Sequence, residues 1–261
     1  MGDSGDPPKE IVVCLDREDL GRQAAEAFVK AADEAVSLRR RFSVSLAGGS
    51  TPRTLYRKLA GRPFAERIPW RAVHLFWGDE RAVPPDHPES NYRMADETLI
   101  SKVPIPPENV HRIPGEWSDA DAAAEAYEEA LRSFFQPPTG KWPSFDLVLL
   151  GIGPDGHTAS LFPGSPALEE KARWVVAPYV EKLNARRFTL TLPVFNHARQ
   201  VHFLAAGKEK APIIKEVVSK DALSQEIPAR LIRPRGGKRL FFLDREAAGL
   251  AGLMDSKENL P

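Results

Sequence analysis

A glycine-rich segment with an aspartate and a histidine holds the residues of this chain best suited to chemistry. The segment covers residues 151–164, reads GIGPDGHTASLFPG and follows directly after the apolar run 145–150. A short buried strand that ends in glycines exposes backbone N–H groups at its carboxyl end, where open α/β sheets bind their ligands. A histidine near a carboxylate can act as a base near neutral pH. We therefore expect an acid–base site here, with Asp155 and His157 as its titratable groups.

The same glycines match the spacing of the dinucleotide fingerprint Gly-x-Gly-x-x-Gly, but their surroundings do not. That fingerprint needs a continuous helix whose N-terminus holds the pyrophosphate, whereas Pro163 leaves room for little more than one turn. Pro154 removes a backbone donor from the loop. The acidic residues about 20 positions further on, Glu169 and Glu170, do not end an apolar strand as a ribose ligand should. We expect no nucleotide cofactor, and no cofactor of another kind.

A second loop, residues 46–52 with the sequence LAGGSTP, also lies between an apolar run and a helical pattern. Gly48 and Gly49 let the backbone approach a ligand, and Ser50 or Thr51 can cap the helix that follows. Free N–H groups, two hydroxyls and the positive end of a helix dipole together favour an anion such as phosphate. An ordinary Ser-Thr-Pro helix start without a ligand explains this segment alone equally well.

A third loop, residues 77–81 with the sequence WGDER, closes an apolar run. Three charges in succession would be costly if buried unpaired, so Asp79, Glu80 and Arg81 are expected to be solvated, mutually paired or facing a ligand. Arg81 could hold a phosphate or a developing oxyanion. Because the strand-to-helix loops of an open parallel sheet gather at one edge, the three loops should converge.

Lys208 follows Gly207 at the start of a predicted helix, where a cation opposes the helix dipole. A bound anion would resolve this conflict, and so would exposure to solvent. Ser160 lies three residues after His157 and is expected to be a cap or packing group. The spacing of Cys, His and carboxylate residues matches no metal-ligand pattern, so we expect no metal.

Short apolar runs alternate with helical patterns along most of the chain, which predicts a parallel sheet covered by helices. The fold class expected is α/β: a single-domain, three-layer, Rossmann-like and mostly parallel sheet flanked by helices, with some antiparallel strands in the C-terminal half. The expected strands are residues 11–15, 42–47, 73–77, 145–150, 174–177, 187–192, 201–206 and 240–243, and the expected helices are residues 19–38, 53–60, 90–101, 119–135 and 208–219.

Length and charge limit the classes of protein that fit. The chain has 261 residues, and its 36 basic and 36 acidic residues cancel, which argues against nucleic-acid or membrane binding by bulk charge. Residues 1–9 are expected to be a flexible tail and residues 10–261 a single domain. The one cysteine, Cys14, has no disulfide partner, so we expect a reducing compartment and a cytoplasmic protein. Any anion site must be local.

Three segments together closely resemble the 6-phosphogluconolactonases, which are relatives of the glucosamine-6-phosphate deaminase/isomerases. They are GGSTP at 48–52, DER at 79–81 with SNY at 90–92, and the run 151–163, and the resemblance covers nearly the whole chain. It implies a hydrolase of carboxylic (lactone) esters that opens 6-phospho-D-glucono-1,5-lactone to 6-phosphogluconate in the oxidative pentose phosphate pathway. The implied partner is the sugar phosphate lactone, and the sequence leaves a monomer and a weak homo-oligomer both open.

The resemblance also implies roles for single residues. His157 would be the general base that takes a proton from the attacking water and returns it to the departing ring oxygen. Asp155 or Asp79 would orient the imidazole or the water. Arg81 or loop N–H groups would stabilise the oxyanion. The 6-phosphate would be held by Gly48, Gly49, Ser50, Thr51 and Lys208. Arg81 would add a further contact.

Two other functions remain possible on the same fold. The deaminase relatives carry a glutamate five residues after the histidine of the Asp-Gly-His turn, and this chain has Phe162 there, which cannot relay a proton. Asp79 corresponds to the aspartate that abstracts the substrate proton in those relatives, so a deaminase/isomerase is the first alternative. A non-catalytic sugar-phosphate sensor is the second, although it would have no use for His157 and would usually carry a partner-binding module.

Overall fold

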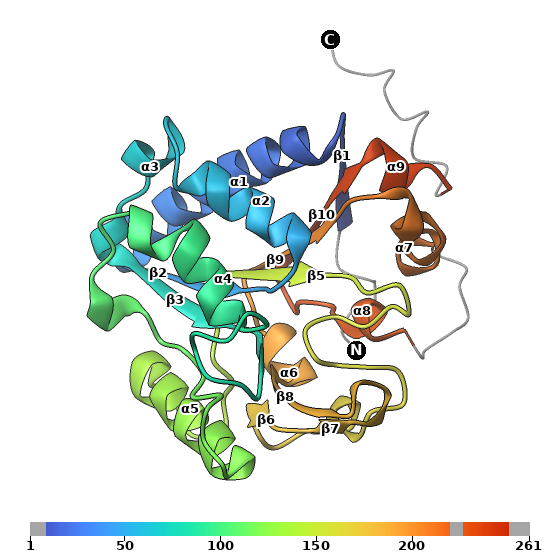
Figure 1. Ribbon diagram of the computed structural model, residues 1–261. Coiled ribbons are helices and arrows are strands. Elements are labelled where there is room, and N and C mark those ends of the chain that lie inside the picture. Colours follow the sequence, from blue (N-terminus) through green and yellow to red (C-terminus); the bar gives the residue numbers. More distant parts are fainter. Residues whose placement is uncertain (1–8, 220–226, 251–261) are drawn as a thin grey trace, which may run out of the picture.

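The computed structural model describes residues 9–219 and 227–250, and Figure 1 shows their arrangement. A six-stranded sheet forms its centre, and all five pairings between neighbouring strands are parallel. The strands of a covered parallel sheet are buried on both faces, and β2 and β5 accordingly consist almost wholly of buried residues. In spatial order the strands are β1 (Lys9–Cys14), β10 (Lys238–Asp244), β9 (Gln200–Ala205), β5 (Leu147–Gly151), β2 (Phe42–Leu46) and β3 (Val73–Trp77).

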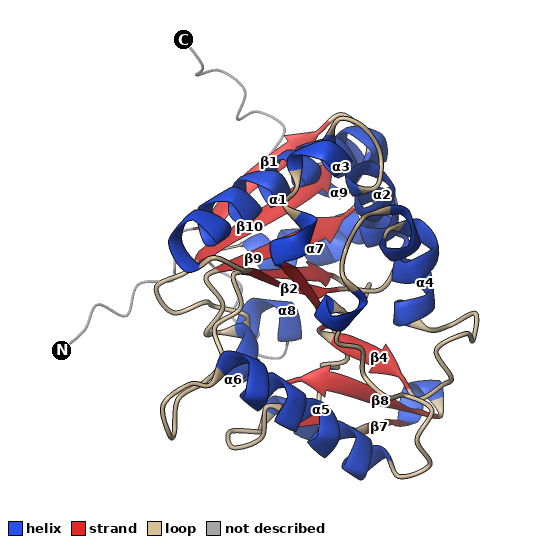
Figure 2. Cartoon of the chain, turned by 90° about the vertical axis from the view of Figure 1, so that its left-hand side faces the viewer, coloured by secondary structure: helices blue, strands red, loops and turns tan. Residues whose placement is uncertain are grey.

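Helices cover one face of this sheet (Figure 2). The longest, α1 (Arg17–Arg39), begins where the Asp16 carboxylate accepts the Asp19 N–H and ends at Arg40 in the left-handed conformation. Its buried side is rich in alanine, which lets the helix approach the strands closely. The helices that accompany it on this side are α2 (Ser50–Leu59), α3 (Phe64–Arg67) and α4 (Asn91–Thr98).

A second layer lies on the other face and contains a small antiparallel sheet. Its strands are β4 (Asp79–Arg81), β8 (Ala185–Leu190) and β6 (Val175–Val176), with β7 (Tyr179–Val180) also paired to β8. Next to it lie α5 (Ala120–Phe135) and α6 (Leu192–Phe195). The buried Tyr127 hydroxyl of α5 lies 2.8 Å from the Trp77 nitrogen and 3.1 Å from its carbonyl, which ties this layer to the end of β3.

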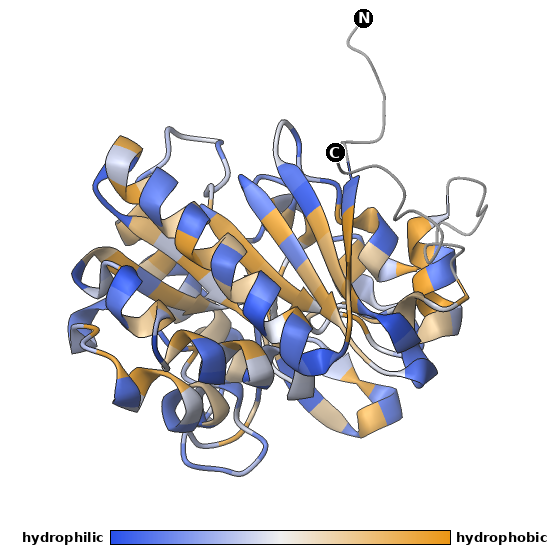
Figure 3. Ribbon diagram, turned by 90° about the horizontal axis from the view of Figure 1, so that it is seen from above, coloured by the Kyte–Doolittle hydropathy of each residue, from blue (hydrophilic) through white to orange (hydrophobic). Residues whose placement is uncertain are grey.

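The remaining helices are short. They are α7 (Ala211–Val218), α8 (Pro228–Leu231) and α9 (Arg245–Ala248), and the single-turn 3-10 helices η1 (Trp70–Ala72), η2 (Ile100–Lys102), η3 (Pro107–Asn109), η4 (Pro166–Leu168), η5 (Glu181–Leu183) and η6 (Lys208–Lys210). Figure 3 shows that the central strands are apolar along most of their length, while the helices over them turn polar residues outward. No helix within residues 9–219 and 227–250 has both the length and the apolar character needed to cross a membrane.

The predicted α/β fold with a mostly parallel sheet flanked by helices is confirmed, and β3 has the predicted bounds. The antiparallel strands differ from the prediction in forming a sheet of their own. The prediction that residues 77–81 form a loop is wrong. After Gly78 the chain enters β4, whose Asp79 pairs with Thr189 of β8. Three charged residues do not alternate with apolar ones, so no strand pattern marks β4. The predicted helix 208–219 is divided into η6 and α7.

The predicted domain boundaries stay predictions. Strand β1 begins at Lys9, the last residue of the predicted tail, and pairs with β10 from that residue on. The rest of that tail and residues 251–261 lie outside the described ranges.

Candidate functional site

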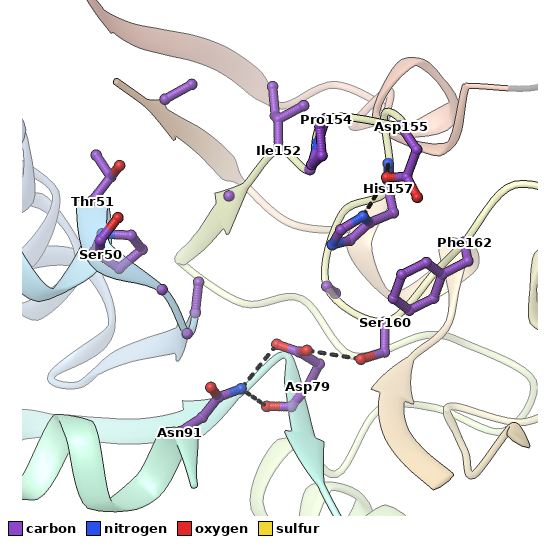
Figure 4. Close-up of a pocket in the computed structure, with 18 of the residues that line it drawn as sticks. Ser50, Thr51, Asp79, Asn91, Ile152, Pro154, Asp155, His157, Ser160 and Phe162 are labelled. Carbon is purple, nitrogen blue, oxygen red and sulfur yellow. Dashed lines mark hydrogen bonds and ion pairs between the residues drawn. The ribbon is translucent and has the colours of Figure 1, made fainter. Parts of the chain in front are cut away.

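A cavity of about 350 Å³ opens at the carboxyl ends of β2, β5 and β9. That volume lies within the range of small-molecule sites, roughly 300–1,000 Å³. One wall is the segment 47–52 after β2, and the opposite wall is formed by residues of 151–162 after β5. The second sheet closes the cavity with residues of β4 and β8. The structure thus brings the three predicted segments together around one space (Figure 4).

His157 and Asp155 form a hydrogen-bonded pair on one wall. The imidazole Nδ1 lies 2.5 Å from Oδ1 of Asp155. Burial alone would raise the pKa of Asp155, but hydrogen bonds with His157 and with Lys182 outweigh it and hold that pKa well below the ordinary value. An ionised carboxylate can only accept, so Nδ1 of a neutral imidazole must carry the hydrogen and Nε2 keeps its lone pair. The ring projects into the cavity, so this pair can present a base there.

Two close neighbours, Gly153 and Phe162, confine the imidazole of His157. A Cβ on Gly153 would lie 2.0 Å from Cε1 and Nδ1 of His157, so only glycine leaves room for the ring. Phe162 stacks on the imidazole at 4.3 Å between ring centroids, with planes 26° apart. The turn between them requires Gly156, whose φ is +79°. No helix begins at this glycine, so the segment lacks the helix that the dinucleotide fingerprint requires.

The opposite wall presents the N-terminus of α2. Gly49 caps the helix with φ of +107°, and no side chain caps it and no acidic residue occupies its first turn. The first N–H groups of a helix have no partner within it. Ser50 and Thr51 carry the first two such groups of α2, and both residues line the cavity. The buried Tyr56 hydroxyl lies 3.0 Å from the Ala47 nitrogen and donates to its carbonyl, which fixes the loop that leads into the helix.

Asn91 joins this wall to β4. A Cβ on Gly48 would lie 1.9 Å from Oδ1 of Asn91, which shows how closely the amide packs on the loop. The same amide donates through Nδ2 to the Asp79 carbonyl at 2.9 Å and to its Oδ1 at 3.3 Å. Ser160 donates to Oδ2 of Asp79 at 2.9 Å, so it links two walls and is not a helix cap. Asp79 contacts these two side chains, and Asp155 is the carboxylate that contacts His157.

Glu80 lies next to the site but does not line the cavity. Its buried carboxylate accepts the N–H groups of Asn91 and Tyr92, both at 2.8 Å, at the start of α4. Burial raises the pKa of Glu80, and these hydrogen bonds oppose that rise. A carboxylate at a helix N-terminus is also favoured by the dipole. Glu80 therefore positions α4, and with it Asn91.

Positive charge exceeds negative charge around the cavity. The lining residues include four cations, namely Arg81, Lys182, Arg187 and Lys210, against the carboxylates of Asp79 and Asp155. Burial lowers the pKa of Arg187, and the charge of Arg81 lowers it further. Among the described residues, the buried Nε of Arg187 has no hydrogen-bond partner. Although the whole chain is neutral, this site is suited to an anion.

Most predicted site residues line the cavity, and one does not. Lys208 is exposed at the start of η6 and lies outside the lining, whereas Lys210 at the other end of that turn is part of it. Sequence reasoning missed Lys210, Lys182, Arg187 and Asn91. Asn91 belongs to the SNY motif and Arg187 begins an alternating strand pattern, so both carried a signal, but neither pattern indicates a ligand-binding side chain.

Within residues 9–219 and 227–250, no three side chains of the His, Cys, Asp and Glu types come close enough together to hold a metal ion. The absence of a required metal remains a prediction.

Comparison with known proteins gives a consistent family relationship. A profile of the family described as glucosamine-6-phosphate isomerases/6-phosphogluconolactonase matches residues 15–241. The chain is 40% identical over 238 residues to the 6-phosphogluconolactonase of Synechocystis sp., covering 91% of this chain and 96% of that protein. It is 38% identical over 239 residues to the protein of the same name from Nostoc sp., covering 92% and 97%.

Solved structures agree in fold. The 6-phosphogluconolactonase of Trypanosoma brucei has a TM-score of 0.82 at 32% identity, covering 93% of this chain and 98% of that one. A monomeric glucosamine-6-phosphate deaminase has a TM-score of 0.76 at 22% identity, covering 92% and 99%. The second likeness concerns the fold alone, because one fold can support different reactions.

Proposed function

The chain belongs to the glucosamine-6-phosphate isomerase/6-phosphogluconolactonase family, and on that premise we propose that it is a 6-phosphogluconolactonase. The reaction is hydrolysis of 6-phospho-D-glucono-1,5-lactone to 6-phosphogluconate, the lactone-opening step of the oxidative pentose phosphate pathway. Relatives that carry this enzyme name match nearly their whole length.

One observation carries the proposal: a histidine paired with a carboxylate and a helix N-terminus free of acidic residues face the same cavity. A phosphate bound at the N-terminus of α2 would leave the sugar ring extending across the cavity toward His157. Four lining cations favour a ligand that is anionic before and after the reaction.

In the proposed reaction, Nε2 of His157 removes a proton from a water molecule as that water attacks the C1 carbonyl carbon. A bond forms between the water oxygen and C1, and the carbonyl oxygen becomes an oxyanion. The C1–ring oxygen bond then breaks, and the imidazolium returns its proton to the departing oxygen. Asp155 keeps the hydrogen on Nδ1 and stabilises the imidazolium, as an ionised carboxylate beside a base should.

The cations and amides are assigned to the two charged ends of the substrate. The N–H groups and hydroxyls of Ser50 and Thr51 hold the 6-phosphate, and Lys210 contributes a charge-assisted contact in place of the exposed Lys208. Arg81 and Arg187, paired across β4 and β8, are the cations available to the developing oxyanion or to the phosphate.

Phe162 favours the lactonase over the deaminase alternative. Its ring stacks on the imidazole of His157, where the deaminases carry a glutamate at the matching position. An aromatic ring holds the base in place but cannot transfer a proton. Asp79 is retained, yet its carboxylate accepts from Ser160 and Asn91.

The test is lactone opening by the purified protein, measured against spontaneous hydrolysis of freshly made 6-phosphogluconolactone. We expect a rate that increases linearly with protein concentration and no ammonia release from glucosamine 6-phosphate. Ammonia release with no effect on the lactone would replace the proposal with the deaminase function. Tight binding of 6-phosphogluconate with neither reaction would replace it with the sensor.

We also propose that the protein works in a reducing compartment, consistent with a cytoplasmic enzyme. Its single cysteine, Cys14, is a buried thiol at the end of β1. One cysteine cannot form an intramolecular disulfide, so the fold does not depend on oxidising conditions.

A further inference from the structure

We propose that Lys182 is a positioning residue that acts through Asp155 on His157. Its ammonium and the imidazole bind the two oxygens of one carboxylate, and this contact joins the β7–β8 hairpin to the base across the cavity rim. The inference rests on the proposed function for its kinetic consequences, and it also predicts a property of the protein without substrate.

The carboxylate of Asp155 is held at both oxygens. Oδ1 lies 2.5 Å from Nδ1 of His157 and accepts the His157 backbone N–H at 3.3 Å, while Oδ2 accepts from Nζ of Lys182 at 3.0 Å. Turning the carboxylate would break contacts on both sides at once. With Lys182 removed, Oδ2 would lose its partner, and only the two contacts of Oδ1, with Nδ1 and the backbone N–H of His157, would hold the carboxylate.

The hairpin that supplies Lys182 is itself well defined. Strand β7 pairs with β8 through Tyr179 opposite Arg186 and Val180 opposite Ala185. The intervening turn, η5, ends at Asn184 in the left-handed conformation, where the Asn184 N–H donates to the Glu181 carbonyl at 3.0 Å. The Tyr179 hydroxyl donates to the Asn184 side chain. Lys182 therefore reaches Asp155 from a fixed turn.

Exposure decides what this ion pair can and cannot do. The side chain of Lys182 is 68% exposed, whereas those of Asp155 and His157 are 25% and 29% exposed. A pair with one exposed partner contributes little to the stability of the fold, in the range of about 0–1 kcal/mol. Its effect is instead concentrated on the half-buried pair, where the ammonium fixes the carboxylate that orients the imidazole.

Other charges also face this pair, so the contribution of Lys182 must be separated from theirs. The same cavity is lined by Asp79 and Arg81 on β4, Arg187 on β8 and Lys210 on η6. None of these has a direct contact with Asp155 among the interactions of the described residues, whereas Lys182 does. Substitution at Lys182 alone thus changes the charge at the carboxylate and leaves the other groups in place.

The experiment compares Lys182→Met and Lys182→Arg with the wild-type protein. Without substrate, the ¹H NMR signal of the hydrogen-bonded Nδ1–H of His157 should be weakened or displaced in Lys182→Met, because Asp155 loses one of its two side-chain partners. Steady-state kinetics should show kcat lowered about 3- to 30-fold at neutral pH, with KM changed less than about threefold. Lys182→Arg should restore most of both values, since it keeps the charge.

Two controls distinguish positioning from a general loss of charge. Lys171→Met removes an exposed lysine outside the cavity lining and should leave the Nδ1–H signal and kcat unchanged. In an Asp155→Asn background, Lys182→Met should have little further effect, because the two side chains act as one unit. Additive losses in that double variant would overturn the proposal.

The experiments test the role of Lys182 and the proposed function separately. An unchanged Nδ1–H signal of His157, or a raised KM with unchanged kcat, would overturn the role of Lys182 and indicate only a contact with the ligand. A protein that shows no lactone opening would overturn the proposed function. The change in the Nδ1–H signal would still test the contact among Lys182, Asp155 and His157.

Discussion

The substitution Gly153→Ala should separate the position of His157 from its chemistry. It keeps every titratable and polar side chain of the site and adds one methyl group. That group would lie 2.0 Å from Cε1 and from Nδ1 of His157, whereas ordinary contacts begin at 3.4 Å. The imidazole must therefore move by about 1.4 Å, a distance that follows from these two values, and any such movement disturbs its stacking on Phe162.

A shift of that size should be costly for catalysis. It would break the 2.5 Å hydrogen bond to Asp155 and move Nε2 away from the attacking water. Misplacement by about 1 Å can reduce a rate about 10²-fold. We expect kcat/KM to fall about 10²- to 10³-fold, which corresponds to about 2.7–4.1 kcal/mol in the activation barrier. Overpacking should cost about 1–3 kcal/mol of unfolding free energy, which leaves a folded protein.

The assay is lactone opening at neutral pH, corrected for spontaneous hydrolysis, together with denaturant unfolding of each variant. Gly61→Ala is the matched control, since its methyl group would lie 3.5 Å from the Arg57 carbonyl, an ordinary contact away from the cavity. That control should keep its activity within about threefold of wild type. The reasoning is refuted if Gly153→Ala folds normally and is as active as the control.

Three further predictions concern other parts of the structure. Gly48→Ala would place a methyl group 1.9 Å from Oδ1 of Asn91, so KM for the lactone should rise about tenfold or more with a smaller change in kcat; an unchanged KM would contradict the phosphate assignment. Asp155→Asn removes the charge beside the base, and kcat should fall about 10²-fold or more while KM stays within about threefold, as steady-state kinetics can check. Burial, followed by the charges of His111 and Arg41, lowers the pKa of His74 to about 4. Because the folded pKa lies below the unfolded one, the stability that His74 contributes is present above about pH 6.5 and is lost as the pH falls toward 4. His74→Phe should flatten the fall in unfolding free energy between pH 7 and pH 5, and an unchanged slope in urea unfolding would argue against this.

The features predicted from sequence are those with local signals. The run that contains Asp155 and His157 could be placed at a strand end because its glycines follow an uninterrupted apolar run. The GGSTP segment contains Ser, Thr and Pro in the order typical of a helix start, and α2 begins there. Parallel strands buried on both faces produce continuous apolar runs. These signals sufficed for the fold class and for two walls of the cavity.

The features that were missed depend on contacts between distant residues. Lys182 is 27 residues from Asp155, and only the pairing of β7 with β8 brings its turn to the cavity rim. Strand β4 has three charged residues and is recognisable only by its partner β8. Lys208 and Lys210 occur in the same short stretch, and the turn of η6 decides which of them faces the cavity.

The central claim is that His157 supplies the base while a separate wall binds the phosphate end. The most direct test is His157→Gln, with turnover measured by lactone opening and product affinity measured by calorimetry with 6-phosphogluconate. The account predicts a loss of kcat of about 10²- to 10⁴-fold with a Kd within about threefold of wild type. Turnover close to wild type, or loss of product binding in a folded variant, would contradict it.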